Sequence, residues 1–172
     1  MSLPYTICFC CCADKVLMLY RYRSPNQNRW NGLGGKIQIS ESPIECVQRE
    51  ILEEANIDLL RASILRFAGI VTWPVGVDIT AKSSGMYAFI AVLPPEWPIW
   101  EGGQITPEGL LCWKPVEWVC HLQNKEVVSN IPHFLPHMLS EQSPSEYFCD
   151  YRGEHFAGLV IRPLSATNAL NL

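Results

Sequence analysis

Runs of apolar residues separated by short polar breaks predict a sheet of several strands. The predicted strands are residues 5–13, 16–22, 61–73, 85–93, 110–119, 146–150 and 156–162. Asp14 and Lys15 are expected to form the turn of a hairpin between the first two strands, and Arg152 and Gly153 the turn between the last two. Pro115 lacks a backbone N–H, so the segment that holds it fits only an edge position or a turn.

One segment carries the start and stop signals of a well-bounded helix. Ser42 is a favourable N-cap, Pro43 suits the first helical position, and Glu45 completes a capping box. Asn56 stands where a left-handed residue commonly ends a helix. A shorter helix is predicted over residues 133–140. The predicted loops are residues 24–28, 75–84 and 94–109.

Composition is typical of a folded domain. Of the 172 residues, 48% are hydrophobic and 17% charged, which excludes a disordered chain. Without repeats or linkers, we expect a single domain over residues 1–172. No run approaches the ~20 apolar residues of a membrane span, and signal-peptide features are missing at the start, so we expect a cytoplasmic protein that does not enter membranes. The eight cysteines are expected to be reduced, because the consecutive Cys10, Cys11 and Cys12 fit neither a zinc site nor ordered disulfides.

The negative charge of the chain is concentrated in one segment. The formal net charge is −4, and residues 34–54 contribute −3 of it. This balance argues against a nucleic-acid polymer as partner, because such proteins neutralise phosphates with clustered Lys and Arg. A small polyanionic ligand would need a cation to approach this segment.

Three carboxylates of the predicted helix fall on one face. At roughly 100° per residue, Glu50, Glu53 and Glu54 share an arc of about 100°. Arg49 offsets part of their repulsion but cannot neutralise all three. Oxygen ligands on a rigid element suit Mg²⁺ or Mn²⁺, and such a metal can bridge phosphate oxygens and orient a water. The alternative interpretation is a solvated acidic helix face.

The spacing of these acids within a longer motif decides between the two interpretations. Five residues separate Gly35 from Glu41, and seven more lead to Arg49 and the three acids. This pattern resembles the Nudix box over 23 positions, with one departure: Asn56 stands where the family usually has Gly. Asn is the next most tolerant residue for a left-handed conformation, so we expect the turn and the metal site to be kept.

The resemblance to Nudix hydrolases implies an α/β fold, with a mixed β-sheet sandwiched between α-helices. It also implies metal-dependent hydrolysis of a nucleoside diphosphate linked to another group. The implied metal ligands are the three helix acids together with the carbonyl oxygen of Gly34. The remaining box residues, Glu41 and Arg49, are implied to orient the helix and the loop rather than to touch substrate.

A closer resemblance covers nearly the whole chain, to the MutT-type oxidised-purine nucleoside triphosphatases. It rests on residues 29–36, residues 5–6 and the C-terminal stretch 146–164. In that subfamily a Thr on the first strand and an Asn after Trp face the nucleobase, and a basic residue on the second strand meets the phosphates. The substrate-binding residues implied here are Thr6, Arg21, Arg23, Asn31, Gly35, Lys36 and Asn130. Glu108 corresponds best to the loop carboxylate that completes the metal site.

One departure from the subfamily concerns the base. Its mammalian members carry an adjacent acidic pair ahead of a late helix, whereas residues 129–132 here contain no acid. The neutral Asn130 can still hydrogen-bond a base, so the choice between 8-oxoguanine and another base stays open. Trp73 is a further candidate, for stacking on the base.

We therefore expect a Mg²⁺- or Mn²⁺-dependent pyrophosphohydrolase that cleaves an ordinary or oxidised purine (deoxy)nucleoside triphosphate to monophosphate and pyrophosphate. Water attacks phosphorus, and Glu54 or Glu108 accepts its proton. Two alternatives remain: a hydrolase of another nucleoside diphosphate derivative such as ADP-ribose, and a catalytically silent nucleotide-binding sensor. The expected partner is a small-molecule nucleotide, and the expected state is a monomer or homodimer.

Overall fold

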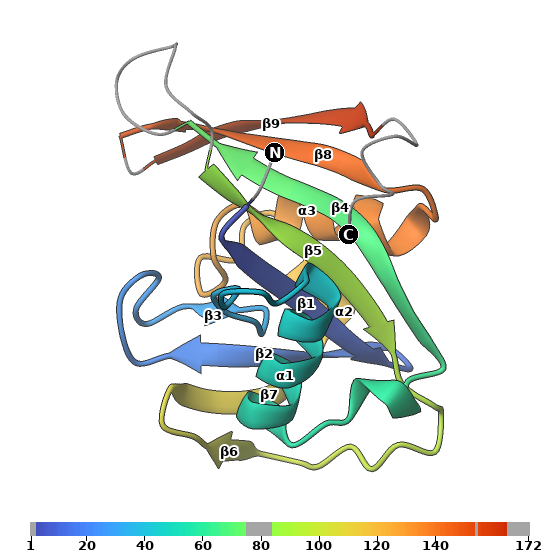
Figure 1. The fold of residues 1–172 in the computed structure, drawn as a ribbon. Coiled ribbons are helices and arrows are strands. Elements are labelled where there is room, and N and C mark those ends of the chain that lie inside the picture. The colour runs from blue at the N-terminus through green and yellow to red at the C-terminus, as the bar shows by residue number, and fades with distance from the viewer. Residues whose placement is uncertain (1–2, 75–83, 154, 165–172) are drawn as a thin grey trace.

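The computed structural model describes residues 3–74, 84–153 and 155–164, whose strands form one sheet. In this part of the chain the strand order is β6-β7-β2-β1-β5-β4-β8-β9, and β3 pairs with β2 (Figure 1). The strands are β1 (Tyr5–Cys12), β2 (Lys15–Arg21), β3 (Trp30–Asn31), β4 (Ile64–Trp73), β5 (Ser84–Val92), β6 (Gly103–Ile105), β7 (Gly109–Pro115), β8 (Ser145–Arg152) and β9 (His155–Pro163). The helices are α1 (Pro43–Ala55), α2 (Val116–Val119) and α3 (Ile131–Ser140), with a 3₁₀ turn η1 (Leu59–Arg61).

Two parallel pairings make the sheet mixed. β1 runs parallel to β5, with Thr6 opposite Tyr87, and β4 runs parallel to β8, with Ile70 opposite Glu146. The pairings of β1 with β2, and of β8 with β9, are antiparallel, and these are the two hairpins that the sequence predicts.

Alternating side chains on β1 divide the core between the two faces of the sheet. Cys8, Cys10 and Cys12 are buried in a cluster with the apolar side of α1. Ile7 and Phe9 point the other way and are buried in a second cluster, which includes α3. Figure 1 shows α1 in front of the sheet and α3 behind it. The predicted α/β fold, a mixed sheet between helices, is therefore confirmed.

The caps of α1 form as their local sequence predicts. Ser42 accepts a hydrogen bond from the backbone N–H of Glu45 at 3.3 Å, and the Glu45 carboxylate accepts one from the Ser42 N–H at 2.8 Å. Asn56 ends the helix in the left-handed region, with φ 54°. Because both ends are fixed by neighbouring residues, the helix presents its acids at defined positions.

Several boundaries differ from the prediction. The strand expected over 61–73 begins at Ile64, because Leu59–Arg61 form a 3₁₀ turn capped by Asp58. The helix expected from residue 133 already begins at Ile131. Most of the predicted loop 75–84 lies outside the described residues, and Ser84 already belongs to β5.

The region around β7 differs most. The predicted loop 94–109 contains a short strand, β6, which covers the outer edge of β7. The prediction that the strand holding Pro115 lies at an edge or turn is correct only for Pro115 itself. This residue ends β7, which pairs with both β2 and β6, and the chain then makes the helical turn α2 instead of continuing as a strand to residue 119.

All eight cysteines are free thiols, as expected for a reduced protein. Six of them are buried, which agrees with the use of Cys as a small apolar core residue. No helix in the described ranges is long and apolar enough to cross a membrane.

Candidate active site

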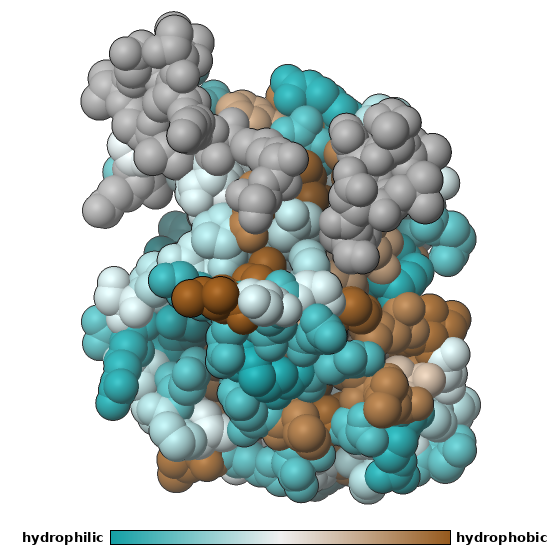
Figure 2. Space-filling model, in the orientation of Figure 1, coloured by the Kyte–Doolittle hydropathy of each residue, from teal (hydrophilic) through white to brown (hydrophobic). Residues whose placement is uncertain are grey.

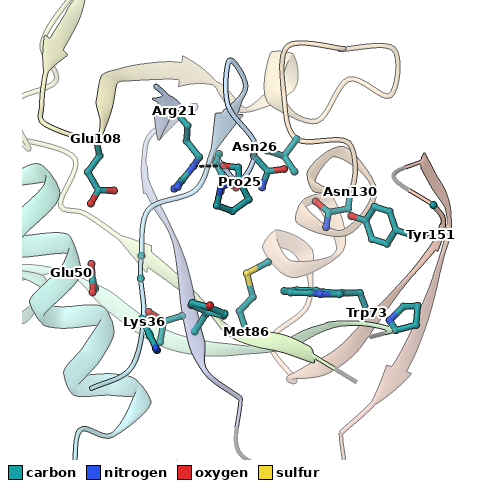
Figure 3. Close-up of a pocket in the computed structure, with 18 residues that line it drawn as sticks. Arg21, Pro25, Asn26, Lys36, Glu50, Trp73, Met86, Glu108, Asn130 and Tyr151 are labelled. Carbon is teal, nitrogen blue, oxygen red and sulfur yellow. Dashed lines mark hydrogen bonds between the residues drawn. The ribbon is translucent and has the colours of Figure 1, made fainter. Parts of the chain in front are cut away.

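A cavity of about 660 Å³ lies beside the glycine loop that precedes α1 (Figure 3). Ten of the residues singled out from the sequence line it: Thr6, Arg21, Asn31, Gly34, Gly35, Lys36, Glu50, Trp73, Glu108 and Asn130. Arg23, Glu53 and Glu54 are not among the lining residues. The cavity thus joins segments that are more than 100 residues apart in the chain.

The glycine loop is attached to β1 like a short extra strand. Cys8 and Leu33 exchange two backbone hydrogen bonds, and the Thr6 N–H donates to the Gly35 carbonyl at 2.8 Å. Gly34 has φ +138°, and a Cβ at this position would lie 2.4 Å from the Thr6 carbonyl oxygen. Only glycine fits here without a shift of the backbone.

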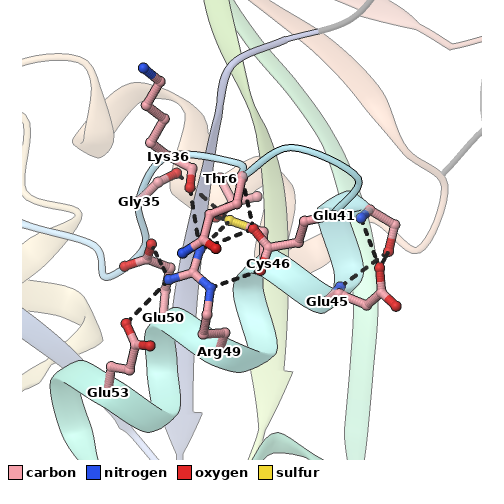
Figure 4. Close-up of polar contacts among 11 residues, drawn as sticks. Thr6, Gly35, Lys36, Glu41, Glu45, Cys46, Arg49, Glu50 and Glu53 are labelled. Atoms are coloured by element: carbon pink, nitrogen blue, oxygen red, sulfur yellow. Dashed lines mark hydrogen bonds and ion pairs between the residues drawn. The ribbon is translucent and has the colours of Figure 1, made fainter.

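Arg49 is the centre of the polar network on α1 (Figure 4). Its guanidinium binds both oxygens of Glu41, at 2.8 and 3.0 Å, and donates to Glu50 at 2.7 Å and Glu53 at 3.2 Å. It also donates to the Lys36 carbonyl at 3.3 Å. The hydrogen bonds from Arg49 lower the pKa of Glu41 to about 2. One cation therefore ties the loop to the helix, which supports the orienting role implied for Glu41 and Arg49.

Glu54 lies beneath the glycine loop rather than on the cavity surface. Its Oε2 accepts a hydrogen bond from the Gly34 N–H at 3.0 Å, while Oε1 is buried and has no hydrogen-bond partner among the residues that the structure describes. Burial first, and then the neighbouring Glu108 carboxyl group, raise the pKa of Glu54 to about 9. A buried carboxylate oxygen without a donor, close to a second carboxyl group, is an environment that a cation would stabilise.

The oxygen-only donor set fits a hard divalent cation. Glu50 lies against the loop so closely that a Cβ on Gly35 would be 2.4 Å from its carboxylate. Among the described residues, no three His, Cys, Asp or Glu side chains converge on one point. The reason is visible in the contacts: Arg49 holds Glu50 and Glu53, and Gly34 holds Glu54. Binding a metal at these acids would replace part of those contacts.

The far side of the cavity is uncharged. We call this the neutral end and define it as Asn26, Trp73, Met86, Val128, Asn130 and Tyr151. Asn130 is only 5% exposed, and its amide nitrogen donates to Cys149 Sγ at 3.7 Å. Burial raises the pKa of Tyr151 to about 12, so its hydroxyl stays protonated. Figure 3 shows Trp73, Asn130 and Tyr151 across the cavity from Glu50 and Glu108.

A family model described as the NUDIX domain matches residues 2–138. The chain belongs to the NUDIX family. The predicted Nudix resemblance is therefore confirmed.

Solved Nudix structures share the fold at low sequence identity. The MutT mutator protein from Bacillus halodurans is 23% identical, with a TM-score of 0.71 over 94% of this chain and 98% of that one. The MutT protein from Methanosarcina mazei Go1 is 19% identical, with a TM-score of 0.56 over 80% and 95%. The NUDIX domain of Shewanella oneidensis NrtR, in complex with ADP ribose, is 18% identical, with a TM-score of 0.59 over 81% and 86%.

Three residues implied by the closer resemblance have different surroundings. Thr6 lines the cavity, and its hydroxyl lies 3.4 Å from Cys46 Sγ. Arg23 is exposed and outside the cavity lining. Asn31 does line the cavity, and its side-chain oxygen accepts a hydrogen bond from the Gly32 N–H at 3.0 Å.

Sequence reasoning missed several lining residues, among them Tyr5, Asn26, Met86, Val128 and Tyr151. The inward direction of Tyr151 could be predicted from the alternation of strand residues, because Tyr151 has the same parity on β8 as the buried Tyr147 and Cys149. The position of Met86 could not be predicted in this way, because it depends on a parallel pairing between distant segments, β5 and β1.

Proposed function

We propose that this Nudix protein is a divalent-metal-dependent pyrophosphohydrolase of purine (deoxy)nucleoside triphosphates, ordinary or oxidised, with monophosphate and pyrophosphate as products. The observation that carries the proposal is the division of one cavity into two parts. Arg21, Lys36, Glu50 and Glu108 make one end charged, and the neutral end offers aromatic and amide groups. A ligand that is polyanionic at one end and a flat heterocycle at the other fits this division.

Glu50, Glu53, Glu54, Glu108 and the Gly34 carbonyl would hold Mg²⁺ or Mn²⁺. When bound, such a metal lowers the pKa of a water and screens the phosphates. Residues of the chain itself bind the substrate and accept the proton. Arg21 and Lys36 bind phosphate oxygens, and Glu54 or Glu108 accepts the proton of the attacking water.

A panel assay tests this function. Pyrophosphate release from 8-oxo-dGTP, dGTP and dATP would be measured in the presence of Mg²⁺. Hydrolysis of ADP-ribose would be measured under the same conditions. We expect Glu53→Gln to lower kcat by about 100-fold or more, because it removes a charged metal ligand. Glu117→Gln, at an exposed acid on α2, is the matched control and is expected to keep the wild-type rate.

The two alternative functions give different results in the same assay. Turnover of no substrate by the wild type would contradict an enzyme and leave a nucleotide-binding sensor. A much higher kcat/KM for ADP-ribose than for every triphosphate would contradict the proposed substrate class.

A further inference from the structure

The loop after β2 reaches the cavity from its own side. Pro25 and Asn26 line the cavity, although residues 22–29 are exposed and no sequence motif marks Asn26. Figure 3 draws Asn26 beside Pro25, on the side of the neutral end where Asn130 lies. The loop therefore contributes a side-chain amide to the wall of the cavity.

A single residue, Arg21, holds this loop at three points. Its backbone N–H donates to the Arg29 carbonyl at 3.1 Å, and its carbonyl accepts from the Asn28 N–H at 2.9 Å. These two bonds close the base of the loop. Its side-chain Nε donates to the Pro25 carbonyl at 2.7 Å, and this bond fixes the residue just before Asn26.

The Arg21 guanidinium also faces the charged end of the cavity, which is formed by Arg21, Lys36, Glu50 and Glu108. It has five N–H donors, and the bond to Pro25 uses only the one on Nε. The next residue, Tyr22, donates its backbone N–H to the Glu108 carbonyl at 3.1 Å, which ties the start of the loop to the segment that carries Glu108. A phosphate group bound by the terminal nitrogens of Arg21 would therefore touch the residue that positions Asn26.

From these contacts we infer that Asn26 is a specificity-determining residue that hydrogen-bonds the edge of the nucleobase, and that Arg21 is its positioning residue. The inference rests on the proposed nucleotide substrate. It adds a second amide, on the same side of the cavity as Asn130, to the group that reads the base. An amide offers two donors and one acceptor, so it discriminates between bases by the pattern of donors and acceptors on their edges.

The choice of test variants at Asn26 depends on its backbone, which is left-handed with φ 61°. Asn26→Gly removes the amide and keeps the left-handed conformation without strain. Asn26→Asp keeps the shape but replaces the donors by acceptors. Asn28 is the matched control, because it has the same φ of 61° in the same exposed loop but does not line the cavity.

Binding is measured so that the result does not depend on hydrolysis. Dissociation constants would be obtained by calorimetry for GMP, AMP, IMP and inorganic tripolyphosphate. We expect Asn26→Gly and Asn26→Asp to change the GMP-to-AMP ratio of dissociation constants by about tenfold, the equivalent of one hydrogen bond. Asn28→Asp adds the same charge and is expected to leave the ratio within about twofold. Asn26→Gly is expected to leave the affinity for tripolyphosphate within about twofold.

Arg21→Lys tests the positioning role. A lysine keeps the positive charge but cannot bind Pro25 and a phosphate through one rigid fork. Arg21→Lys is expected to weaken binding of all four ligands and to shift the GMP-to-AMP ratio of dissociation constants as Asn26→Gly does. The double variant is expected to shift the ratio no further than either single variant, which is the signature of residues that act together.

Each outcome has a distinct meaning. Wild-type base ratios in both Asn26 variants would overturn the inference, even if the protein hydrolyses triphosphates. Base-dependent binding that changes in these variants, with no hydrolysis by the wild type, would uphold the inference and contradict the proposed activity. Failure of the wild type to bind any of the four ligands would contradict both.

Discussion

At the scale of single residues, the most constrained position of the site is Gly34. Its backbone N–H donates to Glu54, and its positive φ brings the chain against the Thr6 carbonyl oxygen. A side chain here would push the loop away from β1 and from α1 at the same time. The backbone of one glycine thus sets the distance between the sheet and the acid that lies deepest under the loop.

We predict that Gly34→Ala lowers the free energy of unfolding by roughly 1–3 kcal/mol through backbone strain, and lowers kcat/KM further, because Glu54 loses its donor. Urea unfolding and initial rates would measure the two effects. Gly158→Ala is the control, since a Cβ there meets no atom of the described residues within 4 Å and the backbone is not left-handed. Equal stability of the two variants would refute the argument.

At the scale of elements, α1 and the hairpins were predictable because their signals are local. Ser42, Glu45 and Asn56 specify the ends of α1 without reference to the rest of the chain. β6 and the 3₁₀ turn η1 were not predictable in this way. β6 has only three residues, all exposed, and is a strand only because β7 offers it an edge.

The capping box gives a prediction for the helix as a unit. Ser42→Ala removes the side-chain acceptor of the Glu45 N–H, and we expect it to lower the free energy of unfolding by about 1 kcal/mol. We expect kcat/KM to stay within about twofold, because Arg49 still ties the helix to the loop. Thermal and urea unfolding would measure the stability of Ser42→Ala. Ser63→Ala, at an exposed serine outside the helices, is the control. A large loss of activity without a loss of stability would assign Ser42 a different role.

At the scale of the whole molecule, the motif located the charged end of the cavity, while the neutral end depended on the fold. Asn130 was singled out by resemblance, but Met86 and Tyr151 come from β5 and β8, and meet only when the sheet has formed. Thr6 lines the cavity as well, and its hydroxyl also lies 3.4 Å from Cys46 Sγ on α1, a contact between distant segments that the motif does not reveal.

Stability of the whole chain is predicted to depend on pH through Glu54. Its pKa rises from 4.5 to about 9 on folding, so the folded state retains a proton that the unfolded state has lost. The stabilisation is complete below pH 4.5 and is lost as pH rises through about 9. With divalent cations chelated, we expect the free energy of unfolding to fall between about pH 5 and pH 9, and Glu54→Gln to reduce that fall.

The effect of Mg²⁺ on stability tests whether Glu54 contributes to the metal site. A cation that binds only the folded state raises the free energy of unfolding, by about 2.7 kcal/mol at one hundred times its dissociation constant. We expect this gain in the wild type at pH 8 and a much smaller gain in Glu54→Gln, with NaCl at equal ionic strength as the control. An equal gain in both proteins would exclude Glu54 from the metal site.

The pairing of the glycine loop with β1 has a consequence for the motions of the site. The backbone groups of Thr6 and Cys8 have their partners in the loop, at Gly35 and Leu33, so these bonds belong to the hydrogen-bonded ladder of the central strand. Local opening of the loop would leave these groups of the buried Thr6 and Cys8 without their partners, which costs more free energy than the fraying of an exposed loop. The loop that approaches the acids is thus bonded to the buried central strand, whereas the loop that carries Asn26 is exposed and is held by the backbone and side chain of Arg21.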